Sequence, residues 1–153
     1  MENKLTVDRA KAIEAYQLAT PDQQRVLESI FGRDALQMSW QEDLKQACKD
    51  LKLNYEFELP YGLPSNKDEE VLNAYAALRI LAKWVRGGWE PDWNNPDEAK
   101  HTPFFTAYGG VRAVCTDTCY HSPAIGALYF PKSSMAINFG RKYIDLYKII
   151  LTN

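Results

Sequence analysis

Apolar residues recur at helical spacing through the first third of the chain, and capping signals mark where the predicted helices begin. The run TPDQ at 20–23 combines a capping Thr, a Pro at the first helical position and a Gln three residues on. The helix that it starts carries an apolar face and ends at Gly32, the face being Val26, Leu27, Ile30 and Phe31. A preceding helix is predicted over 6–19, with Thr6 as its N-cap.

Two further helices are predicted before residue 88. The run SWQE at 39–42 is a second capping box, and the apolar positions after it repeat at helical spacing: Leu44, Ala47, Cys48 and Leu51. Cys48 is therefore predicted to be a small core residue. The next helix runs over 66–86, with Ser65 or Asn66 as its cap, acidic residues in its first turn, Lys83 and Arg86 in its last, and Gly87 after it.

The spacing changes to that of strands and loops in the rest of the chain. Residues 54–59 alternate polar and apolar and predict a short edge strand. Pro91 and Pro96 interrupt regular structure in the Trp-rich and Pro-rich link over 89–103. Strands over 104–108 and 111–116 flank Gly109-Gly110, a hairpin turn, and 124–130 predicts a third strand. A closing helix, capped by Ser133 or Ser134, runs to 151 and contains Gly140, which suggests close packing against the sheet.

These elements predict one α+β domain over 1–153, with a small antiparallel sheet of about three strands. Its mainly helical part covers about 6–87, the link covers 89–103, and the hairpin, third strand and closing helix cover 104–151.

The charge pattern argues against nucleic acid as a partner. The formal net charge is −2, and the Lys and Arg residues form only short groups with carboxylates nearby. A nucleic-acid binder usually concentrates basic residues, because neutralising phosphates supplies most of its affinity. We therefore expect no nucleic acid among the partners.

The cysteines and the apolar runs bear on where the protein resides. Three cysteines give no disulfide framework, the first twelve residues lack the apolar core of a secretory signal, and no apolar run is long enough to span a bilayer. We therefore expect no membrane association and a cytoplasmic location, or a place in a phage particle.

One candidate metal site consists of Cys115, Cys119, His121 and His101, since two thiolates and two imidazoles can complete a tetrahedral zinc site. The alternative is a strand residue followed by a polar loop, because the spacing departs from the usual zinc knuckle. Cys119 with His121 as a nucleophile pair is disfavoured, because catalytic partners normally lie far apart in sequence. No catalytic residue is assigned and no cofactor is expected.

A second candidate site lies in the Trp-rich link, at Trp89, Asp92, Trp93 and Asn95. Two aromatic rings beside carboxylates and amides could stack on and hydrogen-bond a sugar or a peptide, and paired carboxylates could act on a glycosidic bond. The alternative is that the two Trp side chains anchor the loop to the core while the polar groups cap turns.

The closing segment, GALYFPKSSMAINFGRKYIDLYK at 126–148, resembles a small uncharacterised protein family encoded by gut Bacteroidales, their prophages and other mobile elements. In that family a strand ending in Phe-Lys-Ser leads into an Ala- and Gly-containing helix and a Tyr-Lys run. The matching residues, with Pro131 inserted, are Phe130, Lys132, Ser133, Ala136, Phe139, Gly140, Lys142, Leu146, Tyr147 and Lys148. The runs at 66–81, 87–105 and 12–32 are also similar to it.

The resemblance carries no known activity and implies an accessory role in a phage or mobile element. We therefore expect a non-enzymatic protein that interacts with another protein. The alternative is a ligand-binding domain, for carbohydrate or peptide, or an enzyme, using the loop Trp89–Asp97 or the segment Cys115–His121. The oligomeric state is not indicated by the sequence.

Overall fold

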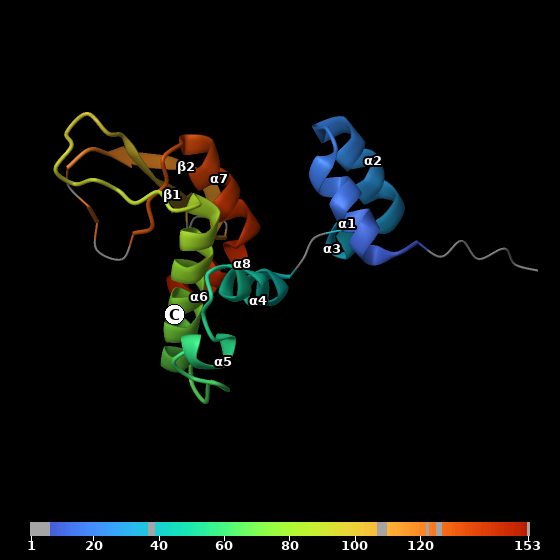
Figure 1. The fold of residues 1–153 in the computed structure, drawn as a ribbon, viewed down its shortest axis with the longest axis horizontal. Coiled ribbons are helices and arrows are strands. Elements are labelled where there is room, and N and C mark those ends of the chain that lie inside the picture. The colour runs from blue at the N-terminus through green and yellow to red at the C-terminus, as the bar shows by residue number, and fades with distance from the viewer. Residues whose placement is uncertain (1–6, 37–38, 107–109, 122, 125–126, 153) are drawn as a thin grey trace, which may run out of the picture. The chain divides into compact units, whose positions relative to one another are not determined.

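The structure, a computed structural model, describes residues 7–36, 39–106, 110–121, 123–124 and 127–152 (Figure 1). Within these ranges the side chains at 10, 17, 34 and 112–115 lie outside the description. The chain divides into two compact units, Met1–Asp43 and Leu44–Asn153. The α+β class is confirmed, whereas a single domain over 1–153 stays a prediction.

The first unit contains α1 (Arg9–Leu18), α2 (Pro21–Phe31) and α3 (Arg33–Leu36). The predicted capping box of α2 is present, because the Gln23 amide donates to Thr20 Oγ1 at 3.4 Å and the Thr20 amide donates to Gln23 Oε1 at 2.9 Å. Gly32 ends α2 with a φ of 80°, a left-handed value that favours Gly. The predicted cap of α1, Thr6, lies outside the described residues, and the short α3 was not predicted.

Helix α4 (Trp40–Asp50) begins in the first unit and continues in the second. Its predicted capping box is present, since the Ser39 amide donates to Glu42 Oε2 at 2.8 Å and the Glu42 amide donates to Ser39 Oγ at 3.3 Å. Leu44 and Cys48 are fully buried, so the prediction of Cys48 as a core residue is confirmed.

The predicted edge strand at 54–59 is wrong, because Tyr55–Glu58 forms the short helix α5. The Asn54 side chain accepts a hydrogen bond from the Glu56 amide at 3.2 Å, which stabilises a helical turn in place of an extended chain. Glu56, in the first turn, also suits the positive end of a helix dipole.

Helix α6 (Lys67–Arg86) is the longest element in the described part of the chain, and its predicted caps are confirmed. Asn66 accepts a hydrogen bond from the Glu69 amide at 3.0 Å, and Gly87 ends the helix in the left-handed conformation. Its buried face is Ala74, Ala77, Leu78, Leu81 and Ala82. The small Ala side chains allow neighbouring elements to approach α6 closely, and α8 packs along it.

The sheet consists of two antiparallel strands, β1 (Lys100–Thr106) and β2 (Arg112–Cys119), in the part of the chain that the structure describes. The predicted antiparallel pairing is thus confirmed, with Thr106 as the last described residue of β1 opposite Arg112, whereas residues 107–109 of the predicted strand and turn lie outside the described residues. Gly110 has a φ of 103°, as expected for such a turn. A register shift between Phe104 and Phe105 marks a β-bulge.

The predicted third strand at 124–130 is not formed as a strand in its described residues. Among the described residues of this segment, only Phe130 joins the sheet, through two hydrogen bonds with His101. The His101 amide donates to the Phe130 carbonyl at 3.0 Å, and the Phe130 amide donates to the His101 carbonyl at 2.7 Å. The pairing does not continue along β1, because the next residue of β1 that faces this side, Pro103, has no amide hydrogen to donate.

Strand β1 begins at Lys100, within the predicted link, and includes Pro103. Backbone groups alternate sides along a strand, and the His101 amide points away from β2 toward Phe130. The Pro103 nitrogen, two residues later, therefore faces the same side. A proline at this position removes no hydrogen bond to β2, so the expectation that 89–103 excludes a strand is wrong for its last residues.

The predicted continuous closing helix is divided into α7 (Ser133–Lys142) and α8 (Ile144–Leu151). Tyr143, with φ −107° and ψ 27°, leaves helical geometry between them, and its ring is buried against Phe139. Lys132 occupies the cap position of α7 without a side-chain bond, so the prediction of Ser133 or Ser134 as the cap is wrong.

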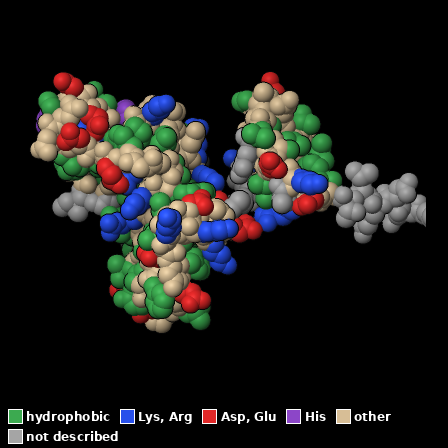
Figure 2. Space-filling view, in the orientation of Figure 1, with side chains coloured by type: hydrophobic (Ala, Val, Ile, Leu, Met, Phe, Trp, Pro, Cys, Tyr) green, Lys and Arg blue, Asp and Glu red, His purple; other side chains and the backbone are tan. Residues whose placement is uncertain are grey.

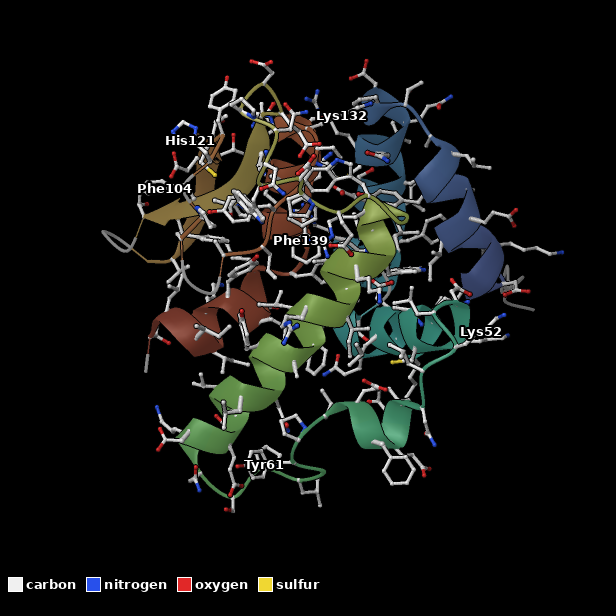
Figure 3. All side chains as sticks on the ribbon, turned by 60° about the vertical axis from the view of Figure 1, so that its left-hand side comes forward. Lys52, Tyr61, Phe104, His121, Lys132 and Phe139 are labelled. Carbon is white, nitrogen blue, oxygen red and sulfur yellow. The ribbon has the colours of Figure 1, made fainter. Side chains whose placement is uncertain are left out.

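Helix α7 packs on both strands, and Gly140 lies where the contact is closest. A Cβ atom on Gly140 would lie 2.8 Å from Pro103 Cβ, which confirms the predicted close packing against the sheet. Phe139 lies between the hairpin and α6, whereas Phe104 and His121 lie at the outer edge of the hairpin (Figure 3).

Candidate binding sites

The loop between α6 and β1 is organised around the side chain of Lys100, which is fully buried. Its ammonium group donates to three backbone carbonyls, at 2.8 Å to Glu98, 3.0 Å to Tyr120 and 3.3 Å to Asn95. The Glu98 carboxylate lies 3.3 Å away as counter-ion, and the ammonium sits 5.2 Å from the ring centroid of Trp93. Lys100 thus ties the loop to the end of β2, because burying a charge is tolerated only with paired, hydrogen-bonded partners.

Three of the four predicted ligand-binding residues of this loop make side-chain contacts within the protein that can be named. Trp93 packs edge-on against Tyr129, with ring centroids 5.1 Å apart. Asp92 Oδ1 accepts a bond from the Asn94 amide at 2.9 Å, and Asn95 Oδ1 accepts one from the Asp97 amide at 3.0 Å. The fourth, Trp89, is half-buried.

These contacts are the anchoring and turn-capping geometry that was the alternative to a ligand site. The Trp93 ring has one face or edge occupied by Tyr129 and by the Lys100 ammonium. Asp92 and Asn95 keep exposed side chains. A ligand-binding role for Trp89, Asp92, Trp93 and Asn95 stays a prediction.

Lys100 was not singled out by the sequence, where it stands in the run DEAKH and looks like one more solvated charge. Two local features nevertheless mark it: it begins a strand, and it follows Glu98 by two residues. Neither feature indicates burial, because one carbonyl partner, Tyr120, follows β2 and lies 20 residues away in sequence, and another, Asn95, comes close only in the folded loop.

The predicted zinc ligands lie on the hairpin and the segment after it. Residues paired across a hairpin share a face, and successive residues alternate faces. Lys100 pairs with Cys119 and His101 with Thr118, which places Cys119 and His101 on opposite faces. His101 Nδ1 lies 2.9 Å from Thr118 Oγ1, and His121 is exposed.

The described residues contain no group of three or more His, Cys, Asp or Glu side chains that could hold a metal ion. The Cys115 side chain lies outside the described residues, so the zinc site with Cys115 stays a prediction. Cys119 is half-buried beside the hydroxyl of Tyr129, whose pKa is raised, first by burial and also by its contact with Cys119.

An apolar groove lies along α1 and α2 in the first unit. It has a volume of about 550 Å³ and is lined by Ala15, Leu18, Ala19, Asp22, Gln23, Val26 and Leu27. Leu18 is 82% exposed, Val26 58% and Ile30 64%, and none of the described side chains of α2 is buried. Apolar side chains gather over α2 in the space-filling view (Figure 2). The predicted apolar face of α2 is therefore formed, and the other described residues of the first unit leave it uncovered.

Comparison with known proteins identifies no relative: no family model, no curated protein and no solved structure matches the chain. Among the described residues, no helix has the length and apolar character needed to cross a membrane.

Proposed function

We propose that the protein is a non-enzymatic accessory protein of a phage or mobile element, and that it binds another protein through the groove between α1 and α2. The observation that carries the proposal is the apolar face of α2, which is formed at helical spacing and exposed. The setting in a phage or mobile element comes from the resemblance of the C-terminal segment to the Bacteroidales family.

The physical argument concerns the stability of the first unit. Leu18, Val26 and Ile30 each keep more than half of their surface exposed within this unit, and that exposed apolar area contributes nothing to folding. Burying a side chain of this kind completely contributes roughly 1.5–3 kcal/mol, so covering three of them contributes several kcal/mol. Isolated helices as short as α1 and α2 are marginal in water, so a covering partner also stabilises the helices themselves.

The shape of the groove indicates what kind of partner segment would cover it. Two neighbouring helices present a furrow into which the apolar ridge of a third helix packs. Recognition of an amphipathic helix by such a groove uses apolar anchors spaced by three or four residues. An amphipathic helix of a partner protein is therefore the proposed occupant.

The test measures binding to the products of the genes that neighbour this one. Each product is co-expressed with the chain, and binding is measured with purified proteins for the wild type and for V26E/I30E. The matched control is F57E/L63E, which places the same charges on exposed apolar residues of the second unit. Circular dichroism checks that each variant stays folded, which we expect because none of these four side chains is buried.

The proposal predicts that one neighbouring product binds the wild type and the control, and binds V26E/I30E at least about tenfold more weakly. Binding that is unchanged in V26E/I30E would contradict it. A wild-type dimer in light scattering that becomes monomeric in V26E/I30E would also contradict it, because a second copy of the chain would then cover the groove.

A further inference from the structure

A second concave site lies on the C-terminal half of α6, on the face where positively charged residues recur. This pocket has a volume of about 420 Å³, within the range of small-molecule sites. Arg79, Lys83 and Arg86 line it from one face of α6, at spacings of four and three residues. Its apolar wall consists of Leu53, Ala76, Ile80 and Leu128. Lys and Arg side chains gather around α6 and α4 in the space-filling view (Figure 2).

The three cations are incompletely satisfied by the protein. In the part of the chain that the structure describes, Arg79 and Lys83 make no ion pair and no side-chain hydrogen bond. Arg86, whose side chain is only 12% exposed, is paired with Glu90 at 3.6 Å and donates to the Tyr129 carbonyl at 3.4 Å. Its Nε is buried and has no hydrogen-bond partner among the described residues.

A buried, charged donor without a partner is unusual in a native structure and points to a missing acceptor. Two unpaired cations on the same wall give that acceptor a negative charge. Arg guanidinium groups are the preferred donors to the tetrahedral oxygens of phosphate, because their planar fork can donate two parallel bonds.

We propose that this pocket binds the phosphate group of a small organic phosphate monoester, with the organic part on Ile80 and Leu128. The phosphate lies among Arg79, Lys83 and Arg86, and accepts from the Arg86 guanidinium as that side chain turns toward it. A dianion suits three cations of which one is already paired with Glu90. Glu58, the other carboxylate of the pocket, excludes a ligand that carries negative charge at both ends.

The test uses isothermal titration calorimetry at physiological salt with phenyl phosphate, inorganic phosphate and benzoate as probes. Three forms of the full chain are compared: the wild type, R79Q/K83Q, and the control K67Q/R141Q. The control removes two positive charges from exposed residues that do not line the pocket. Arg79 and Lys83 are exposed, so R79Q/K83Q is expected to fold, and a thermal melt verifies it.

We expect phenyl phosphate to bind the wild type and the control alike, and to bind R79Q/K83Q about tenfold to hundredfold more weakly, as the loss of charged hydrogen bonds predicts. I80A is expected to weaken phenyl phosphate and leave inorganic phosphate unchanged. No binding of either phosphate, an equal loss in the control, or tighter binding of benzoate than of phenyl phosphate would overturn the proposal. The last result would assign the pocket to carboxylates.

Discussion

Replacing Gly140 by Ala tests whether contact between α7 and the sheet holds the second unit together. Within a helix, Ala is favoured over Gly by about 1 kcal/mol, so propensity alone predicts a more stable protein. At this position the new methyl group would lie 2.8 Å from Pro103 Cβ and 3.3 Å from Phe105 Cζ. Overpacking of this kind costs typically 1–3 kcal/mol, and the Pro103 ring cannot rotate away.

The balance of the two effects decides the sign. We expect G140A to lower the free energy of unfolding by about 1–2 kcal/mol, because the closest atom is fixed to the backbone of β1. The free energy is measured by urea denaturation followed by circular dichroism. N138A serves as the control, since it places Ala on the exposed side of the same helix and should leave stability unchanged or slightly higher. A G140A protein at least as stable as the wild type would refute the packing argument.

Three further changes test local contacts, each with its own measurement. K100M removes the ammonium group that donates to three carbonyls, and we expect it to lower the free energy of unfolding by about 2–3 kcal/mol. The free energy is measured by urea denaturation, and an unchanged value would mean that Lys100 does not hold the loop. The Arg9 side chain donates a hydrogen bond to Glu42 at 3.0 Å and is the main cause that lowers the pKa of Glu42 to about 2. The stability that this carboxylate contributes is therefore fully present above its ordinary pKa of 4.5 and is lost as the pH falls through about 2. R9Q should return the Glu42 pKa toward 4.5 in an NMR titration, and a value that stays near 2 would assign the shift to other groups. N73A removes the side chain that both donates to and accepts from the backbone of Tyr61. We expect it to lower the free energy of unfolding by about 1–2 kcal/mol and to speed hydrogen exchange of the Tyr61 amide. Unchanged exchange at Tyr61 would contradict this prediction.

The parts of the fold that the sequence predicted depend on neighbouring residues. The capping boxes at Thr20 and Ser39 were found because each needs only four consecutive residues. Helix α6 was placed with both ends because Asn66 and Gly87 lie directly beside it. Gly140 was recognised because a Gly in a helix interior has a cost that close packing can explain.

The parts that were mispredicted depend on residues far away or on a choice between two local structures. Residues 54–59 alternate as a strand does, but the Asn54 side chain caps a helical turn, and no neighbouring strand is available to pair with them in the described residues. The helix break at Tyr143 has no Pro or Gly to announce it. Its ring is buried against Phe139, and tertiary packing of this kind overrides helix periodicity.

The roles of the candidate site residues also depend on contacts that the sequence does not reveal. Aromatic residues beside carboxylates drew attention to the Trp-rich loop, yet Trp93 packs on Tyr129 and on the Lys100 ammonium, which lie 36 and 7 residues away in sequence. The pocket on α6 was hidden in the sequence because Lys83 and Arg86 also suit a helix C-terminus. What distinguishes it is the buried, unpartnered Nε of Arg86, and only the packed structure shows which donors lack an acceptor. Unsatisfied groups are therefore the better guide to a site in this chain than residue types that often occur in sites.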